Sequence, residues 1–161
     1  MATLILICGL PGSGKTTLAK QLEQERPALR LTPDDWITRL FGPDPAPAIL
    51  DGARDPVESV QWEVAARALT LGVDVLLDFG FWSRSEREQF RARAAELGAG
   101  SEVRFLNVPR AVLSARLAAR NAELPPGTFR VSEAQLEEWW TLFEPPMADE
   151  LRPRPGRLTL R

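Results

Sequence analysis

The residues with the clearest chemical meaning lie at positions 9–16, which read Gly-Leu-Pro-Gly-Ser-Gly-Lys-Thr. This Gly-x4-Gly-Lys-Thr pattern is a phosphate-binding P-loop, and it directly follows the apolar run 3–8. Its glycines let successive backbone N–H groups turn toward anionic oxygens, and the start of the following helix adds partial positive charge. The spacing predicts that Lys15 reaches the β- and γ-phosphates of a nucleoside triphosphate and that Thr16 ligates Mg²⁺.

The nucleotide-binding residues predicted from this loop extend into the first turn of the following helix. They are Gly9, Leu10, Pro11, Gly12, Ser13, Gly14, Lys15, Thr16 and Thr17. Only Lys15 and Lys20 are lysines among the 20 basic residues, so a chain that otherwise uses arginine has a compact ammonium at the phosphate-binding position. The Asn-Lys-x-Asp sequence with which GTPases recognise guanine is absent. We therefore expect the cofactors ATP and Mg²⁺.

A pair of carboxylates, Asp34 and Asp35, follows the second predicted strand. Thr32 and Pro33 precede them, and Trp36 follows. One interpretation is local: Thr32 caps a helix, Pro33 takes its first position, and the carboxylates suit the positive end of the helix dipole. The other is catalytic, since strands beside the P-loop strand end near the γ-phosphate, where a carboxylate accepts the proton of an incoming hydroxyl. The residues alone leave both interpretations open.

A third carboxylate, Asp78, ends the apolar run 73–78. In P-loop proteins an aspartate at this place holds Mg²⁺ or its waters, so Thr16 and Asp78 are the predicted metal ligands. The next residue is Phe79, whereas ATPases that split water commonly have glutamate there, which argues against a hydrolytic motor. A turn at the end of a strand is the alternative interpretation of Asp78.

Arginines in the last third of the chain are candidates for contact with the transferred phosphate. Arg116 and Arg120 share one face of a predicted helix over 110–122, and Arg130 follows a Pro-Pro-Gly break. On a flap that closes over the triphosphate, such arginines would neutralise charge as the phosphoryl group moves. A solvated helix face is the alternative interpretation.

Aromatic residues flank the acidic positions. Trp36 follows Asp35, and Trp82 lies four residues after Asp78. If the loops that carry them share one edge of the sheet, these rings would flank an acceptor pocket and stack on a base, a sugar or an antibiotic ring. Core packing is the default role of tryptophan and is the alternative interpretation.

Short apolar runs and helical patterns alternate along the chain and would position these residues. The predicted strands cover about 3–8, 29–32, 73–78, 102–108 and 157–160. Capping-box sequences at 55–58, 83–86 and 132–135 mark helix starts, and the Pro-rich connection 42–56 is expected to form a lip near the site. This alternation predicts an α/β fold with a parallel sheet and helices on both of its faces.

Composition limits the classes of function. The chain has 161 residues, a formal net charge of −2, no histidine and one cysteine, Cys8. A general base must therefore be a carboxylate, a structural zinc site is disfavoured, and a protein-wide electrostatic grip on nucleic acid is not expected. The apolar run at the N-terminus is too short for a signal peptide, and no segment reaches membrane-spanning length, which predicts a cytoplasmic protein.

With a P-loop, an Asp-Asp pair and late arginines in this order, the sequence resembles the small P-loop kinases grouped around polynucleotide 5′-kinase, chloramphenicol phosphotransferase and the zeta toxins. The resemblance covers most of the chain, and the P-loop is its specific motif. It implies one domain over 1–161 with a three-layer α/β/α P-loop kinase fold. That fold has a five-stranded parallel sheet with the P-loop strand central, and a helical lid at about 116–133.

Residue roles follow from the same resemblance. In polynucleotide kinases the first Asp of an Arg-Asp-Asp segment is the general base, and Asp34 is its counterpart here. An arginine that contacts the transferred phosphate in those kinases has Ile37 at its place, and the nearest arginine is Arg39. The expected catalytic residues are Lys15, Asp34, Arg116 and Arg120. The expected substrate-binding residues are Asp35, Trp36, Arg39, Asp78, Trp82 and Arg130.

Together these observations predict an ATP-dependent kinase that transfers the γ-phosphate to a hydroxyl of a small molecule such as a nucleoside, a sugar or an antibiotic. The acidic net charge and the aromatic residues favour a small acceptor. A 5′-hydroxyl polynucleotide kinase is an alternative that a basic channel leading to Asp34 would favour. An ATP-binding switch without transfer activity, which needs a protein partner, is the alternative from another class.

Overall fold

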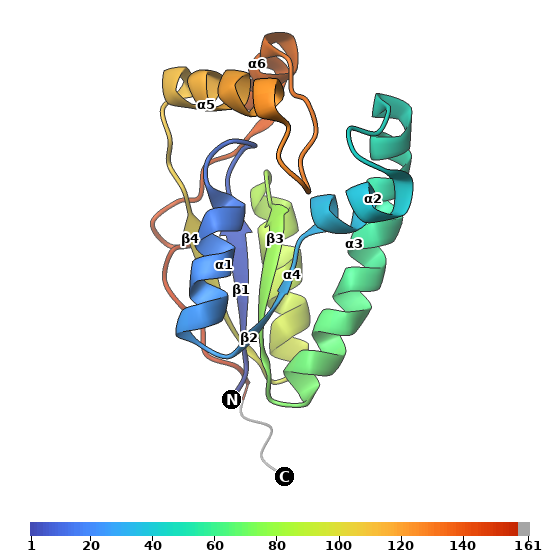
Figure 1. Cartoon of the computed structure of the whole chain (residues 1–161). Helices are drawn as coiled ribbons and strands as arrows, with labels where there is room; N and C mark the ends of the chain where they lie inside the picture. Colours follow the sequence, from blue (N-terminus) through green and yellow to red (C-terminus); the bar gives the residue numbers. More distant parts are fainter. Residues whose placement is uncertain (158–161) are drawn as a thin grey trace.

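The apolar runs of the sequence form a parallel β-sheet with helices on both faces (Figure 1). The structure, a computed structural model, describes residues 1–157. Its elements in chain order are β1 (Thr3–Cys8), α1 (Lys15–Glu25), β2 (Ala28–Leu31), α2 (Pro33–Phe41), α3 (Pro47–Thr70), β3 (Asp74–Gly80), α4 (Arg84–Glu96), β4 (Gly100–Phe105), α5 (Arg110–Glu123) and α6 (Glu133–Leu142). The strand order is β2-β3-β1-β4, so the P-loop strand β1 is an inner strand. The predicted α/β class with a parallel sheet is confirmed.

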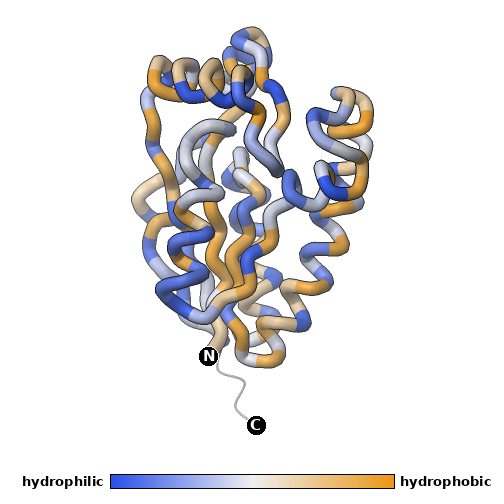
Figure 2. Tube along the Cα trace, viewed as in Figure 1, coloured by the Kyte–Doolittle hydropathy of each residue, from blue (hydrophilic) through white to orange (hydrophobic). Residues whose placement is uncertain are grey.

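Alternate residues of β1 face two layers of helices. Leu4, Leu6 and Cys8 belong to a buried cluster with residues of α3 and α4, whereas Ile5 and Ile7 pack against α1. Burial on both faces explains why the sequence of this strand is a continuous apolar run. Figure 2 shows hydrophobic residues concentrated along the strands and hydrophilic residues along the outer surface of the helices.

The sheet has four strands within residues 1–157, one fewer than the five expected. The fifth predicted strand, 157–160, lies outside the described residues except for Arg157, which is in no strand. The C-terminal segment occupies the outer edge of β4, where Ser101 and Arg154 exchange backbone hydrogen bonds of 2.8 and 2.9 Å in antiparallel orientation. A single bridge of this kind covers the edge without extending the sheet.

Two of the three predicted capping sequences start helices. Ser83 Oγ accepts a hydrogen bond from the Glu86 backbone N–H (3.1 Å) at the start of α4, and Ser132 and Gln135 form a reciprocal capping box at α6. The third prediction is wrong, because α3 begins at Pro47 and the Pro-rich connection is correspondingly shorter than 42–56. Proline suits the first position of a helix because its missing N–H would have no intrahelical partner there.

Helices α5 and α6 and the loop between them lie across the carboxyl edge of the sheet, above the P-loop (Figure 1). We refer to residues 110–142 as the upper segment. Its apolar residues form a separate buried cluster in which Leu10 of the P-loop packs with Leu113, Leu117 and Leu136. None of the helices within residues 1–157 is both long and apolar enough to span a membrane.

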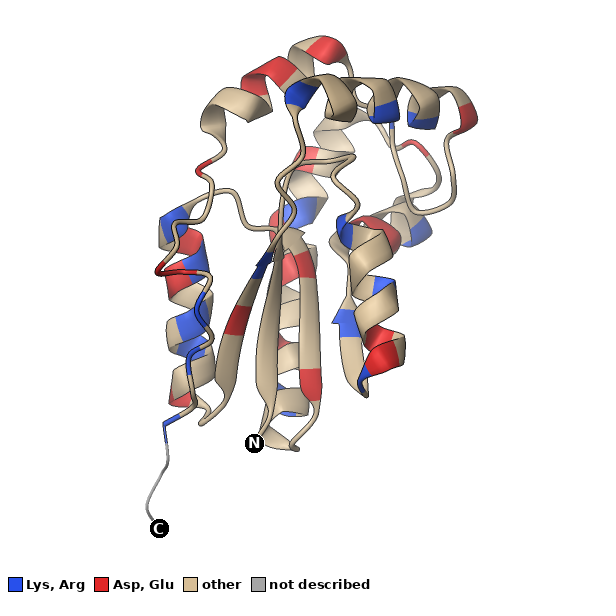
Figure 3. Ribbon diagram, turned by 90° about the vertical axis from the view of Figure 1, so that its left-hand side faces the viewer, with Lys and Arg blue, Asp and Glu red and all other residues tan. Residues whose placement is uncertain are grey.

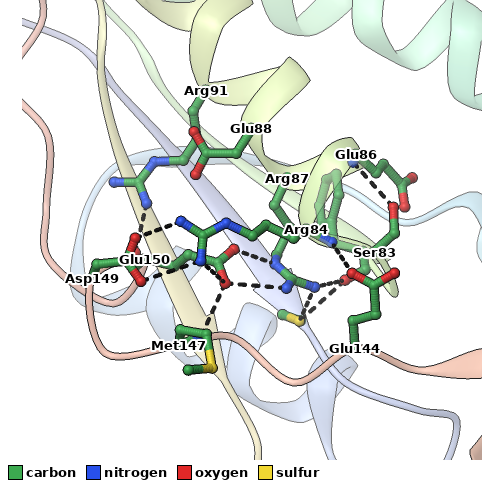
Figure 4. A network of polar contacts seen from close by, with 12 residues as sticks. Ser83, Arg84, Glu86, Arg87, Glu88, Arg91, Glu144, Met147, Asp149 and Glu150 are labelled. Carbon is green, nitrogen blue, oxygen red and sulfur yellow. Dashed lines mark hydrogen bonds and ion pairs between the residues drawn. The ribbon is translucent and has the colours of Figure 1, made fainter.

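A buried ion pair fixes the C-terminal segment to α4 (Figure 4). Arg87 and Glu150 are both fully buried, and the guanidinium Nε donates to Glu150 Oε1 over 2.8 Å. Arg87 also donates to the carbonyl oxygen of Phe81 (2.8 Å), which follows β3. Arg91 donates to the carbonyl oxygens of Glu150 (2.5 Å) and Arg152 (2.8 Å). Arg91 thus satisfies backbone acceptors of the C-terminal segment, and Arg87 pairs with its buried carboxylate.

Replacing Arg87 by methionine should destabilise the fold by about 3–5 kcal/mol, because the Glu150 carboxylate would stay buried without its partner. Urea unfolding followed by tryptophan fluorescence measures the change. Arg104→Met is the control: it removes an exposed ion pair with Glu102 and should have a much smaller effect. Equal losses in the two variants would contradict the role assigned to the buried pair.

Candidate functional site

Residues 9–14 connect β1 to α1 through a backbone that requires glycine at two positions. Gly12 and Gly14 have φ angles of +83° and +95°, in the left-handed region that other residues rarely adopt. Gly12 is also closely packed, since a Cβ there would lie 3.1 Å from Leu117 Cγ of α5. The first N–H groups of α1, which begins at Lys15, have no intrahelical partners and are available to an anion.

Asp78, near the carboxyl end of β3, is hydrogen-bonded to two threonines of the site. Its Oδ2 accepts hydrogen bonds from Thr16 Oγ1 (2.7 Å) and Thr32 Oγ1 (3.1 Å). Its Oδ1 is buried and has no protein partner within residues 1–157. Burial raises the pKa of Asp78, and the ammonium of Lys15 lowers it. An unpartnered carboxylate oxygen close to a threonine hydroxyl fits a hard cation such as Mg²⁺, which takes oxygen ligands.

Lys15 lies where the charges of four other elements meet. Burial lowers the pKa of its ammonium, whereas Asp78 and Asp34 raise it. Arg120 and Arg54 are also close enough to act on Lys15, and as cations they lower its pKa. Side chains from β3, α2, α5 and α3 therefore surround the lysine of the P-loop.

The two adjacent carboxylates of α2 have different partners. Asp34 Oδ1 accepts a hydrogen bond from Arg54 Nη2 of α3 (2.8 Å), and Asp35 Oδ2 accepts one from Arg30 Nη1 of β2 (2.9 Å). Thr32 stands at the N-cap position of α2, but its hydroxyl makes no capping bond. The hydroxyl accepts a hydrogen bond from Arg30 (2.7 Å) and donates to the carboxylate at the end of β3 instead. Asp35 is thus fixed to β2, and Asp34 to α3.

Both predicted arginines of α5 face the site beneath them. Arg116 Nη1 lies 3.3 and 3.5 Å from two carbonyl oxygens of the P-loop. Arg120 Nη2 donates to the carbonyl oxygen of Phe129 (3.4 Å), and its Nε is buried with no partner in the described part of the chain. Burial lowers the pKa of Arg120, and Asp34 raises it. Arg120 is therefore partly withdrawn from solvent, whereas Arg116 is exposed and reaches the P-loop from the surface of the helix.

One cavity of about 1280 Å³ joins these residues. Most of the predicted site residues line it: Pro11, Gly12, Ser13, Gly14, Lys15, Thr16, Thr17, Asp34, Asp35, Asp78, Trp82, Arg116 and Arg120. The loop 125–129 of the upper segment also lines it, and Gly127 (φ +78°) lies so close to Asp35 Oδ1 that a Cβ would overlap that oxygen. Because ligand sites typically measure roughly 300–1,000 Å³, the cavity has room for a nucleotide and a second ligand.

Three predicted substrate-binding residues are not part of the cavity lining that residues 1–157 form. Trp36 packs into the core beside α3, as the alternative interpretation expected. Arg39 is exposed on the last turn of α2. Arg130 Nε pairs with Asp44 Oδ2 over 2.9 Å at the surface. The helical rotation explains the first two cases, because the face of α2 that carries Asp34 toward the cavity turns the later residues away from it.

Gly9 and Leu10 are not in the cavity lining that residues 1–157 form, and instead attach the P-loop to its neighbours. The Gly9 N–H donates to the carbonyl oxygen of Gly80 (3.0 Å), which ties the loop to the end of β3. Leu10 is 3% exposed and packs into the cluster of the upper segment. These two residues shape the loop through packing and backbone contacts.

The sequence reasoning missed the contribution of α3. Arg54, which binds Asp34, lines the cavity together with Glu58, whose Oε1 lies 3.5 Å from Arg54 Nη1. A helix start placed at 55 left Arg54 in a loop, whereas α3 begins at Pro47. The signal was the helical spacing of Ala53 and Val57, both buried, which extends the apolar face of α3 toward its true start. Figure 3 shows that charged residues gather on the helices and loops, while the strands carry few.

Several solved structures share this fold. A structure of the Pnkp1/Rnl/Hen1 RNA repair complex matches with a TM-score of 0.73 and 18% identity over 98% of this chain and 49% of the other, so this chain spans about half of that protein. Kti12 from Chaetomium thermophilum, in complex with ADP-AlF3, matches with a TM-score of 0.69 and 20% identity over 89% and 81% of the two chains. A gluconokinase from Sinorhizobium meliloti 1021 matches with a TM-score of 0.62 and 20% identity over 92% and 79%.

At these identities the likeness establishes the fold, which is that of P-loop kinases. A comparison with curated protein sequences found no match. A family model described as an AAA domain matches residues 4–146, which include the P-loop, β1 except for Thr3, strands β2 to β4 and both helices of the upper segment. The chain therefore belongs to this AAA domain family and has a P-loop kinase-like fold.

Proposed function

We propose that this protein is an ATP- and Mg²⁺-dependent kinase that transfers the γ-phosphoryl group to a hydroxyl of a small molecule. The observation that carries the proposal is the cavity that Lys15 and Asp34 both line. Burial lowers the pKa of the Lys15 ammonium, and the carboxylate of Asp34 lies close enough to offset part of that change. Phosphoryl transfer to an alcohol needs a lysine that binds the phosphates and a carboxylate that accepts the proton of the alcohol.

In the proposed reaction the P-loop N–H groups and Lys15 bind the β- and γ-phosphates. Asp34 takes the proton of the acceptor hydroxyl while the oxygen of that hydroxyl forms a bond to the γ-phosphorus. The bond from that phosphorus to the β–γ bridging oxygen breaks, and ADP leaves. Arg54 binds Asp34 Oδ1, which leaves Oδ2 for the acceptor. Thr16 and Asp78 would hold Mg²⁺, which when bound neutralises charge on the phosphates.

The upper segment serves as the lid in this proposal. Arg116 lies over the P-loop and Arg120 lies close to Asp34, so both arginines can neutralise charge on the phosphoryl group in transit. The loop 125–129 lines the cavity on the acceptor side and would exclude water, which would otherwise compete with the acceptor for the phosphoryl group.

The charge of the cavity favours a small molecule, and not the end of a nucleic acid, as the phosphoryl acceptor. Beyond the P-loop it is lined by the carboxylates of Asp51, Asp55, Glu58 and Glu86, and Arg54 is the one cation that α3 adds to this lining. Carboxylates repel the phosphates of a polynucleotide, which need a basic surface. The lining formed by the described residues is thus unlike the basic channel that a polynucleotide kinase requires.

Lys15→Ala should abolish phosphoryl transfer and also tight nucleotide binding, because the substitution removes the cation that contacts the β- and γ-phosphates. Titration with a fluorescent ATP analogue measures the binding, and transfer of label from γ-labelled ATP measures the activity. Arg104→Ala removes an exposed cation of β4 that does not line the cavity, and should weaken binding far less. Unchanged nucleotide affinity in the Lys15 variant would contradict the proposed site.

Asp34→Asn should lower the turnover number by ~10²–10⁴-fold, the usual contribution of a general base, with nucleotide affinity nearly unchanged. The assay follows label from γ-labelled ATP into a panel of sugars, nucleosides, hydroxylated antibiotics and 5′-hydroxyl oligonucleotides. Asp35→Asn is the neighbouring comparison, and its loss should be smaller because Asp35 is bound to Arg30. Equal turnover in wild type and Asp34→Asn would assign the base to another carboxylate.

A further inference from the structure

Arg30 is an arginine of the edge strand β2 that the proposed reaction does not use. Its side chain is 19% exposed, and carboxylates from two helices bind it. Its Nε donates to Glu23 Oε2 of α1 (3.1 Å), and its Nη1 donates to Asp35 Oδ2 of α2 (2.9 Å). Burial opposes the charge of the guanidinium, but the hydrogen bonds with Asp35 and Glu23 raise its pKa above the ordinary value. The guanidinium is therefore charged and held in one orientation.

The same Nη1 also donates to the hydroxyl of Thr32 (2.7 Å), and this bond decides where the hydroxyl hydrogen goes. A guanidinium has donors only, whereas a hydroxyl has one hydrogen and accepts through its lone pairs. Because Thr32 Oγ1 accepts from Arg30, its own hydrogen is free for Asp78 Oδ2, which lies 3.1 Å away. Arg30 thus makes Thr32 a donor toward Asp78.

Thr32 gives up a local role for this contact. It stands at the N-cap position of α2, where a threonine hydroxyl usually accepts a hydrogen bond from a backbone N–H of the first helical turn. Its side chain makes no such bond, and the residue is 4% exposed, so the hydroxyl has no access to water as a substitute. A local preference that is not met is typical of residues at functional sites. The position of the hydroxyl is explained by Arg30 and Asp78, and not by the start of the helix.

Two hydroxyls from different elements fix the carboxylate of Asp78. Thr16 Oγ1 of α1 and Thr32 Oγ1, which follows β2, both donate to Oδ2, over 2.7 and 3.1 Å. This arrangement leaves Oδ1 as the oxygen that fits a hard cation. Thr16 is itself a proposed ligand of Mg²⁺, whereas Thr32 contributes to the site through Asp78. The contacts therefore run from Arg30 through Thr32 to a proposed metal ligand.

We propose that Arg30 is a positioning residue for the Mg²⁺–nucleotide site, and that it fixes the orientation of Asp78 through the hydroxyl of Thr32. The inference rests on the metal site of the proposed function and adds to it a residue of the edge strand. Hydrogen-bonding partners behind a metal ligand orient that ligand, and their loss typically lowers metal affinity by about 10–100-fold. The loss of Arg30, or of the Thr32 hydroxyl, should therefore weaken the part of nucleotide binding that depends on Mg²⁺.

The test measures nucleotide binding without turnover. A fluorescent ATP analogue is titrated into wild type, Thr32→Val and Arg30→Met, in EDTA and at a series of Mg²⁺ concentrations. Thr32→Val removes the hydroxyl and keeps a branched side chain of similar size. In EDTA both variants should bind the analogue as wild type does. For the half-maximal gain in affinity they should need at least about tenfold more Mg²⁺ than wild type.

A double variant tests the route through Thr32. If Arg30 acts on Asp78 through that hydroxyl, Arg30→Met should add little to the Mg²⁺ requirement of Thr32→Val, because residues in one hydrogen-bond network are not additive. Effects that add fully in the double variant would overturn the proposed route, since Arg30 would then act independently of Thr32.

Arg26→Met is the matched control. Arg26 follows α1, and its Nε donates to Asp74 Oδ2 (3.0 Å) at the opposite end of β3 from Asp78. It is also a partly buried arginine that joins neighbouring elements, so its loss should lower stability toward urea about as much as the loss of Arg30. Its Mg²⁺ requirement should stay that of wild type, because its contacts lie far along the strand from the metal site. A requirement raised as much as in Arg30→Met would overturn the specific role of Arg30.

The outcomes separate this inference from the kinase proposal, because the binding measurement needs no acceptor. A raised Mg²⁺ requirement in both Thr32→Val and Arg30→Met supports the role of Arg30, even if wild type transfers label to no acceptor and the kinase proposal fails. Transfer of label by wild type, with an unchanged Mg²⁺ requirement in Arg30→Met, supports the kinase and overturns the role of Arg30. That role is also overturned if Mg²⁺ does not tighten the binding of the analogue to wild type.

Discussion

The interaction between Lys15 and Asp78 is the constraint on which the carboxyl edge of the sheet depends. Both groups are withdrawn from water, which favours the neutral form of each, and each shifts the pKa of the other back toward its charged form. The same carboxylate of Asp78 accepts hydrogen bonds from the hydroxyl groups of Thr16, in α1, and Thr32, which follows β2. One side chain thus fixes the P-loop relative to two neighbouring strands, so the phosphate-binding groups are held in place before a ligand arrives.

Charged groups of both signs line the cavity. The cations Lys15, Arg116 and Arg120 line it together with the carboxylates of α3 and α4. Asp34 and Arg54, which also line it, form an ion pair. The core beneath is apolar, since β1 is buried on both faces by apolar side chains. Rigid apolar layers thereby support charged groups that would otherwise need solvent.

Local patterns predicted the parts of the site that depend on consecutive residues. The P-loop, the strand that carries Asp78 and the Ser132 capping box are all encoded within a few positions of the chain. Arg54 was missed because its role depends on where α3 begins and which face of it is buried, and neither follows from neighbouring residues. The prediction that Trp36 binds substrate was wrong for the same reason. Its distance along the chain from Asp34 was known, but the rotation of α2 was not. The sequence thus reveals chemistry carried by a loop more readily than chemistry assembled between helices.

The packing of Gly127 against Asp35 limits how the sequence of this protein can change over time. A side chain at position 127 is opposed twice, by a left-handed backbone and by the carboxylate oxygen that a Cβ would overlap. Asp35 cannot easily turn aside, because Arg30 binds it from β2. Positions 30, 35 and 127, which are far apart in the chain, are therefore coupled. A replacement at one of them would be tolerated only together with changes at the others, so these positions are expected to vary jointly among relatives.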